Sequence, residues 1–382
     1  MIQKAVIQVA VLMIIMLMPF RSQAQEPDDD FLQVGGALRF NYNLSSWKEG
    51  QMKRGGDLGY DLFRLNVLGS YNGIRLNAEY RWYSEGFGGG MLKQGFIALD
   101  AGSRSELQIG LNQVPFGIQQ YNSHNWFFNL TYYLGFEDDH DMGIKYIYDH
   151  AQWQWQAAWY LSAEELVFDE VEASPRRYSY DVTGRNKENN QLNLKGLYRF
   201  GSDNRWQAGA SLQGGLLYNL DTQHNGNHYA MAVHAERLPM ESPLGLKAQY
   251  MHYGFNPEAQ QGQADNFIMM GAYGANYRVA SAGHLFSLAA SWQLDVSMPY
   301  LQGITFYNDF GYLYKPEAGF EDTYMNVTGM LLDAGKVFVY VDLAMGYNHP
   351  WLGPEWTRSL AYGTPGGAGW HRRFNINLGY YF

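Results

Sequence analysis

Arginine and lysine side chains recur on one face of segments in which polar and apolar residues alternate. They are the residues with the clearest chemical role. Between residues 74 and 83, Arg75, Glu79 and Arg81 share one parity, and the residues of the other parity are apolar or aromatic: Ile74, Leu76, Ala78, Tyr80 and Trp82. Successive side chains of a β-strand point to opposite faces, so such a segment has one apolar face and one charged face. A wall of positive side chains that faces water concentrates anions and raises the rate at which they enter.

The same parity argument, applied along the chain, assigns nine basic and five acidic side chains to the wet face, although the whole chain has a net charge of −10. Arg39, Arg64, Arg75 and Arg81 lie on three consecutive segments and are predicted to form one basic patch. In the alternative, the charges on residues 75–81 pair with their neighbours as a neutralised ladder. The basic set is Arg39, Arg64, Arg75, Arg81, Lys145, Lys195, Lys247, Arg278 and Arg373, and the acidic set is Glu79, Glu106, Glu236, Asp309 and Asp342.

Catalytic and metal-binding patterns are weak by comparison. Ser211 and His234 are examples of potential nucleophiles and bases, but no G-x-S-x-G elbow is present, and the chain is predicted not to be an enzyme. The absence of cysteine excludes disulfides, metal thiolates and thiol catalysis. The acidic run 137–141 lacks the spacing of a calcium loop and is interpreted as a solvated loop. We therefore predict no cofactor and no metal, and the negative net charge argues against a nucleic-acid partner.

The segments that carry these residues are predicted to be strands of an all-β, transmembrane antiparallel barrel. In 152–161, Trp153, Trp155 and Trp159 alternate with glutamine, alanine and tyrosine. The chain contains seventeen segments of this kind between residues 37 and 382. Tight turns alternate with long connections, including 46–57, 163–189 and 348–369, as in outer-membrane barrels. Because such barrels have an even number of strands, one of the seventeen segments must be wrongly bounded, and we expect this error in 284–323. We predict about sixteen strands, with eighteen as the alternative.

Both ends of the chain indicate export to the outer membrane of a Gram-negative bacterium. Residues 1–24 combine a basic start, an apolar stretch from Ala5 to Met18 and a small-residue cleavage site, which is typical of a signal peptide. Residues 25–382 would then form the barrel in contact with outer-membrane lipid. The chain ends in an alternating aromatic strand with Phe382 last, a pattern typical of the signal that the barrel insertion machinery binds.

Segment 114–141 is unusually aromatic for a surface connection, and we predict that it folds into the lumen and narrows it. The alternative is an extracellular cap that packs on itself. The residues expected at the constriction are Tyr121, His124, Trp126 and Tyr132.

The chain resembles the porin O and porin P family of phosphate-selective porins in two stretches. Leu107 to Gly117 (LQIGLNQVPFG) is similar to the strand and Pro-Phe-Gly turn of that family, and Asp141 to Tyr146 (DMGIKY) is similar to its return strand. Between them, acidic residues stand where the family usually carries arginines. The resemblance implies a porin barrel, a homotrimer and phosphate-like anions as solutes.

The leading expectation for function is passive diffusion of small hydrophilic solutes, with a preference for anions. Tryptophan and tyrosine rings near a constriction could instead stack on sugars, which would make a saccharide-preferring pore. A third alternative is a plugged structural or adhesive barrel with 163–189 and 348–369 as surface epitopes.

Overall fold

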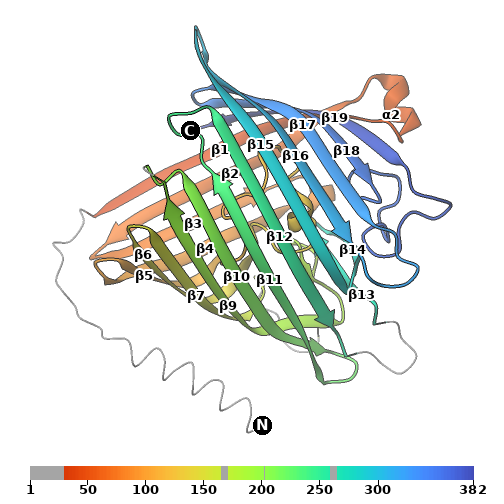
Figure 1. Cartoon of the computed structure of the whole chain (residues 1–382), viewed down its shortest axis with the longest axis horizontal. Coiled ribbons are helices and arrows are strands. Elements are labelled where there is room, and N and C mark those ends of the chain that lie inside the picture. Colours follow the sequence, from red (N-terminus) through yellow and green to blue (C-terminus); the bar gives the residue numbers. More distant parts are fainter. Residues whose placement is uncertain (1–29, 165–170, 202, 259–264) are drawn as a thin grey trace.

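The computed structural model describes residues 30–164, 171–201, 203–258 and 265–382. Their strands form a closed antiparallel barrel of sixteen, which confirms the predicted fold class (Figure 1). The predicted signal peptide, residues 1–24, lies outside the described residues. The barrel strands are β1 (Phe31–Ser45), β2 (Asp57–Tyr71), β3 (Ile74–Trp82), β4 (Gly90–Gly102), β5 (Ser105–Gln113), β6 (His140–His150), β7 (Trp153–Ser162), β9 (Asn186–Phe200), β10 (Trp206–Asn219), β11 (Asn225–Arg237), β12 (Leu244–Asn256), β15 (Ala282–Met298), β16 (Leu301–Tyr314), β17 (Thr323–Ala334), β18 (Val337–Tyr347) and β19 (Trp370–Tyr381).

The first and last strands close the barrel. β1 pairs with β19 from Ala37 opposite Tyr381 to Ser45 opposite Arg373. The backbone of Phe382 extends this pairing, because its amide and carbonyl bond to Gly36 at 3.1 and 2.9 Å. A closed sheet satisfies its backbone hydrogen bonds internally, which is the condition for strands to cross a lipid bilayer.

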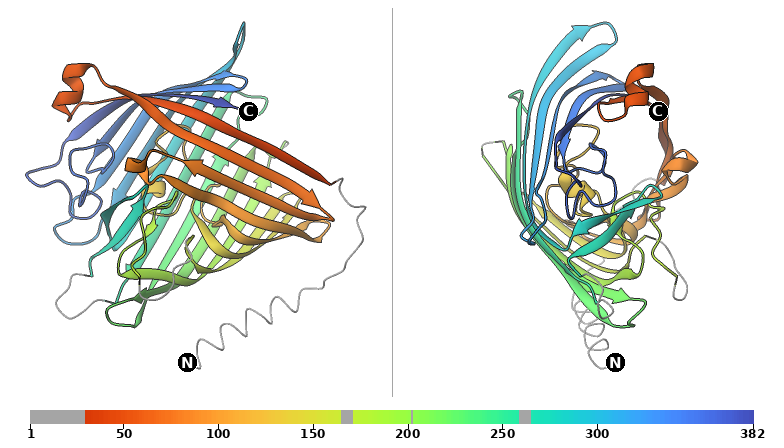
Figure 2. Two further views of the ribbon diagram at one scale, coloured as in Figure 1. Left: turned by 180° about the vertical axis from the view of Figure 1, so that it is seen from behind. Right: turned by 90° about the vertical axis from the view of Figure 1, so that its right-hand side faces the viewer.

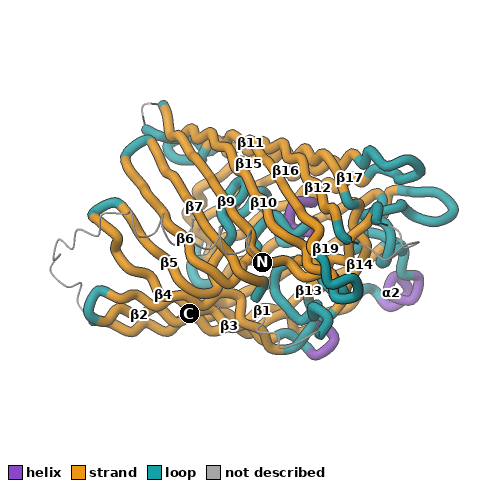
Figure 3. The backbone as a smooth tube through the Cα atoms, turned by 90° about the horizontal axis from the view of Figure 1, so that it is seen from below, coloured by secondary structure: helices purple, strands orange, loops and turns teal. Residues whose placement is uncertain are grey.

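The side chains alternate across the wall as the sequence predicts. On β7, Trp153 and Trp155 are exposed on the outer surface, whereas Gln156 and Tyr160 are buried inside the barrel. An outer face of aromatic and aliphatic side chains suits contact with lipid. Figure 3 shows that strands dominate the tube and that helices are few and short.

Segment 266–279 is the predicted strand that does not belong to the wall. It forms a hairpin of β13 (Phe267–Ala272) and β14 (Ala275–Ala280), and β13 also pairs with β8 (Asp181–Val182) in a separate three-stranded sheet. Ile268, Tyr277 and Val279 of this hairpin are buried in the protein core. The alternating pattern correctly predicts β-structure, but alternation alone cannot distinguish a lipid-facing apolar side from one that packs on protein.

The predicted error in the strand count is therefore in the wrong place. Segment 284–323 contains two genuine wall strands, β15 and β16, which pair directly up to Met298 opposite Leu301. Tyr300 makes their tight turn possible by adopting a left-handed backbone conformation with φ of 68°. Removing the hairpin 266–279 from the seventeen predicted segments leaves the observed sixteen.

The helical segments are α2 (Glu49–Arg54), the 3-10 turn η1 (Glu85–Phe87) and α3 (Leu130–Tyr133), and all lie in connections between strands. In the described part of the chain, no helix has the length and apolar character needed to cross a membrane. In the right-hand view of Figure 2, the segment that carries α3 lies inside the ring of strands.

Candidate functional site

The connection between β5 and β6, residues 114–139, bonds to inward-facing side chains of several wall strands. This connection is called the inner loop below. Gln119 and Asp138 bond to side chains of β7, β9 and β4. The other partners run along one half of the wall, from β10 to β18. The bonds are Gly117 N to Ser211 Oγ (3.1 Å), Ile118 N to Gln249 Oε1 (2.9 Å), Asn122 Nδ2 to Ser287 Oγ (2.6 Å), His124 N to Asp309 Oδ2 (2.9 Å) and Trp126 N to Asp342 Oδ2 (3.4 Å).

Asp309 on β16 is the main anchor for the tip of the inner loop. Its carboxylate accepts hydrogen bonds from the backbone amides of His124 and Asn125 at 2.9 and 3.1 Å. It also contacts His124 Nδ1 at 2.8 Å and accepts from Asn125 Nδ2 at 2.7 Å. Lys247 on β12 donates to the carbonyl of Tyr121 at 2.7 Å. The polar groups of the tip are therefore directed at the wall.

The acidic run at the end of the inner loop is buried, so the prediction of a solvated loop is wrong. Asp138 pairs with Lys93 Nζ at 2.8 Å and accepts from the hydroxyl of Tyr178 at 2.7 Å. Glu137 accepts from Asn122 N at 2.8 Å, and burial raises the pKa of Glu137 to about 7. The run turns inward because the loop folds back on the wall. Among the described residues, no carboxylates or imidazoles are grouped so that they could hold a metal ion.

Further carboxylates gather around Arg177, in the connection between β7 and β9. Arg177 pairs with Glu164 at 3.0 Å and with Asp181. Ser179 Oγ donates to Asp139 and Glu164, both at 3.1 Å. Burial raises the pKa of Asp139 well above its usual range, and the nearby carboxylates of Asp181 and Glu164 add to this shift. These contacts join the β7–β9 connection to the inner loop.

A cavity of about 680 Å³ remains between the inner loop and the wall formed by β19, β1, β2 and β3. Its lining includes five basic residues but only two acidic ones, Asp57 and Asp61. The inner loop contributes mainly aromatic side chains to the opposite side. The basic lining residues are Arg39, Lys48, Arg64, Arg81 and Arg373, and the predicted constriction residues Tyr121, His124, Trp126 and Tyr132 all line the cavity.

The basic residues of the cavity are neutralised to different degrees. Arg39 pairs with Asp61 at 2.9 Å, and Arg81 pairs with Glu79 at 2.5 Å. Arg64 approaches Glu79 only to 3.7 Å. Arg373 has no carboxylate partner within the described part of the chain, and its guanidinium lies over the ring of Trp47, 5.1 Å from the centroid.

Arg75 differs from the other three arginines of the predicted patch. It does not line the cavity, and it pairs with Asp100 and Glu106, each at 2.8 Å. The structure thus brings Arg39, Arg64 and Arg81 together at one cavity, whereas Arg75 belongs to a neutralised ladder.

The predicted lysines support the inner loop and do not line the cavity. Lys145 donates to the carbonyl of Gln113, the last residue of β5 before the loop, at 2.7 Å, and Lys195 donates to Gln119 Oε1 at 2.9 Å. Lys247 bonds to the loop tip as described above. Arg278 was expected on the wall, but it lies on β14 with its guanidinium 4.7 Å from the ring centroid of Phe267. Glu106, Glu236, Asp309 and Asp342 are also absent from the cavity lining.

Several cavity residues were missed at the level of sequence. Asp61 was not predicted to face inward, because a β-bulge opposite Arg39 inserts one residue into β2 and reverses which residues of β2 face the interior. Tyr178 and Tyr273 reach the cavity from the connections between β7 and β9 and between β13 and β14. No periodic signal marks a residue of an irregular connection, so only the folded chain identifies them.

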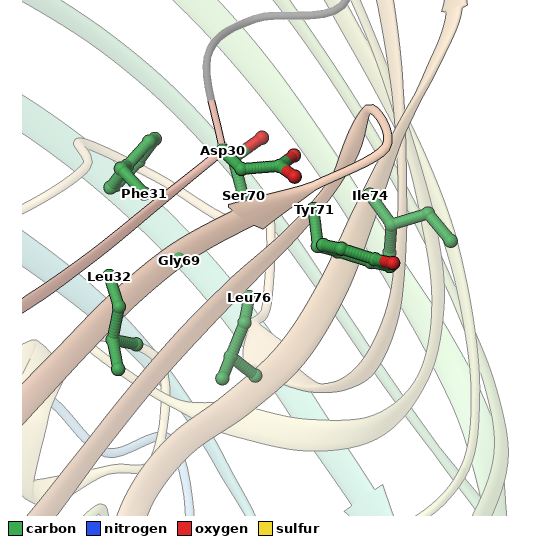
Figure 4. A pocket seen from close by; sticks show the side chains of 8 residues that line it. All are labelled: Asp30, Phe31, Leu32, Gly69, Ser70, Tyr71, Ile74 and Leu76. Atoms are coloured by element: carbon green, nitrogen blue, oxygen red, sulfur yellow. The ribbon is translucent and has the colours of Figure 1, made fainter.

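A second, outward-facing pocket of about 440 Å³ lies beside the N-terminal end of β1 (Figure 4). It is lined mainly by apolar side chains, including Leu32 and Tyr71, which are 72% and 67% exposed. At the edge of this pocket, Asp30 accepts a hydrogen bond from the backbone amide of Asn72 at 3.0 Å. Its position outside the barrel separates it from the lumen.

No protein-family model and no curated protein matches the chain. Solved structures do match it over nearly its whole length. One is the loop L8 deletion mutant of OmpT, an outer membrane protein of Vibrio cholerae, with a TM-score of 0.60, 12% identity and coverage of 93% of this chain and 100% of that chain.

Two further structures match equally broadly. The anion-selective porin from Comamonas acidovorans has a TM-score of 0.58 and 11% identity, and covers 93% of this chain and 100% of its own. The outer membrane channel DcaP of Acinetobacter baumannii has a TM-score of 0.54 and 10% identity, with coverage of 96% and 100%. This chain therefore has the β-barrel fold of Gram-negative outer-membrane porins.

Proposed function

We propose that this protein is an outer-membrane pore through which small hydrophilic solutes diffuse passively, with a preference for anions. The observation that carries the proposal is the cavity between the inner loop and the β19–β1–β2–β3 wall, whose basic lining residues outnumber the acidic ones. Charged groups that line a narrow passage with low-dielectric walls focus the field onto passing ions.

The position of the loop carboxylates strengthens the preference. Glu137 and Asp138 could have opposed the basic wall across the cavity, but both are buried and neither lines it. The side of the loop that faces the arginines is aromatic. The field of Arg64 and Arg373 is therefore opposed by few negative charges.

The phosphate-selective porins remain a resemblance in two motifs, and the matched structures support the porin fold without that specificity. We propose a preference for negative charge and not for phosphate in particular. A homotrimer and recognition of Phe382 by the insertion machinery are carried forward as proposals. Chemical cross-linking in detergent would test the trimer.

The charge preference is tested by changing Arg64 and Arg81 together to glutamine and measuring the reversal potential under a KCl gradient in a planar bilayer. The double variant should lose most of its anion preference, and the loss should be larger at low salt because screening is weaker there. Arg75→Gln is the matched control and should change the anion-to-cation permeability ratio little, because Arg75 is paired with two carboxylates outside the cavity.

An unchanged anion-to-cation permeability ratio in a double variant that inserts and conducts would show that the basic wall does not set the charge preference. A wild-type barrel that inserts but carries no current would favour the plugged structural alternative.

A further inference from the structure

We propose that the cavity binds small carboxylates that carry a flat ring, with the ring against the inner loop and the carboxylate on Arg64. This inference rests on the proposed function and names the class of solute that the pore prefers among anions. The rings of Tyr121, Trp126 and Phe128, which all line the cavity, are called the aromatic face.

The aromatic face is ordered by ring contacts. Phe128 stacks on Tyr132 with centroids 4.1 Å apart and an interplanar angle of 15°. Tyr121 meets Phe128 edge to face at 5.4 Å and remains 38% exposed. Aromatic rings favour further rings in stacked or edge-to-face geometry. A flat ring that enters the cavity would therefore extend an arrangement that already exists.

The backbone at Phe128 shows that the ring position is imposed. Phe128 has φ of 64°, in the left-handed region that a bulky side chain rarely occupies. Such a conformation costs free energy and persists only where surrounding contacts hold it. Here the stacking on Tyr132 and the anchoring of the neighbouring tip residues by Asp309 supply those contacts.

Most polar groups of the loop tip are already engaged, with Asn122 Oδ1 and Ser123 Oγ as the exceptions, and this favours a ring acid over a sugar. The carbonyls of Tyr121 and Ser123 accept from Lys247 at 2.7 and 3.3 Å. Asn122 bonds to Ser287, and Asn125 bonds to Asp309. Few of these groups remain for the hydroxyls of a saccharide, whereas the aromatic surface is free to contact an apolar ring.

Arg64 is the best-placed partner for the carboxylate. Its side chain is 22% exposed, its closest carboxylate contact in the described structure is 3.7 Å from Nη1, and its guanidinium lies 5.2 Å from the ring centroid of Tyr381. Arg81, in contrast, is engaged by Glu79 and by the hydroxyl of Tyr83 at 3.2 Å. The two Nη atoms of a guanidinium can bind a carboxylate through two parallel hydrogen bonds.

Ring contacts connect the two halves of this site. The guanidinium of Arg81, on the same wall as Arg64, lies 4.1 Å from the ring centroid of Tyr178. Tyr178 in turn packs against Tyr132, which carries Phe128. The basic wall and the aromatic face therefore border one continuous cavity, and its volume of about 680 Å³ is within the range of small-molecule sites.

The test compares three probes on the reconstituted full-length protein in a planar bilayer carrying KCl current. Benzoate has both ring and carboxylate, acetate has only the carboxylate, and benzyl alcohol has only the ring. Benzoate should block the current saturably at a concentration roughly threefold to tenfold lower than acetate, which corresponds to one additional aromatic contact. Benzyl alcohol should not block.

Variants assign the two contacts. Tyr121→Leu should bring the half-blocking concentration of benzoate close to that of acetate while the anion preference is retained. Arg64→Gln should weaken block by both acids. Phe320→Leu, an aromatic substitution in the connection between β16 and β17 and outside the cavity lining, is the matched control and should leave benzoate block unchanged.

Equal block by benzoate and acetate in a conducting, anion-preferring pore would overturn this inference alone. Strong benzoate block that survives in a folded Tyr121→Leu pore would also overturn it, because the aromatic face would then not be the ring site. A pore without anion preference would instead contradict the proposed function itself.

Discussion

At the scale of single residues, the carboxylates of the inner loop explain how a chain of net charge −10 can present a basic cavity. Glu137 is 3% exposed and Asp138 is 5% exposed, and each is satisfied inside the protein. Asp138 neutralises Lys93 at 2.8 Å. Glu137 has no cation within hydrogen-bonding distance in the described structure, and burial disfavours its ionised form. These acids hold the loop in place and contribute little negative charge to the cavity.

Glu137 should make the stability of the inner loop depend on pH. Burial raises its pKa to about 7 in the folded protein, from an ordinary value of 4.5. A raised pKa favours the protonated folded form, so this stabilisation is complete below pH 4.5 and is lost as the pH rises through 7. Amide hydrogen exchange of residues 114–139 should therefore indicate easier opening at pH 9 than at pH 5, by roughly 2 to 3 kcal/mol.

Glu137→Gln keeps the shape of the side chain without the titration. Compared with this variant at the same pH, which cancels the intrinsic pH dependence of exchange, the wild-type loop should be selectively weakened at pH 9. Glu317→Gln, in the connection between β16 and β17, is the control and should behave as wild type. Identical pH profiles for wild type and Glu137→Gln would show that Glu137 is ionised throughout.

At the scale of elements, the wall strands separate two environments along a single segment. On β7, Trp155 is 53% exposed on the outer surface, whereas the side chain of Gln154 points into the barrel and bonds to Asp149 at 2.6 Å. The hairpin of β13 and β14 has the same kind of alternation but packs inside the protein. The position of an element in the barrel therefore decides whether its apolar face meets lipid or protein.

The outer face of β7 should not tolerate charge. Trp155→Arg or Ala157→Arg should lower the free energy of unfolding by roughly 2 to 4 kcal/mol if the site lies near the middle of the bilayer. Gln154→Arg, one position away, should be nearly neutral because it faces the wet interior. Urea titration of refolding into lipid vesicles would measure the difference, and equal losses at positions 154 and 155 would contradict the assigned faces.

At the scale of the whole molecule, the inner loop divides the lumen unequally. The loop bonds to β10, β12, β15, β16 and β18 and, through Gln119 and Asp138, to β7, β9 and β4. The cavity lies against β19, β1, β2 and β3. The three-stranded sheet and the β7–β9 connection fill further space beside the loop. Solutes are therefore expected to pass along one sector of the barrel.

Single cysteines can map this sector, because the natural chain contains none. Asn41→Cys lies in the cavity lining on β1 and should react with an anionic methanethiosulfonate reagent, with a stepwise fall in current. Asn193→Cys also faces inward, on β9, but that position is 1% exposed and should not react in the folded pore. Rapid block at position 193 and none at position 41 would place the solute path on the opposite side of the loop.

The sequence by itself determined the barrel, its alternating faces and its strand number to within one, because period-two patterning reflects the contrast between lipid and water at every strand. It also placed Arg39, Arg64 and Arg81 on the inward face, where they line the cavity, since charged residues on a wet face stand out from apolar neighbours. Only the tertiary structure decided that segment 266–279 leaves the wall and that the acidic run is buried. Both depend on contacts between connections far apart in the chain, and a local pattern carries no information about such partners.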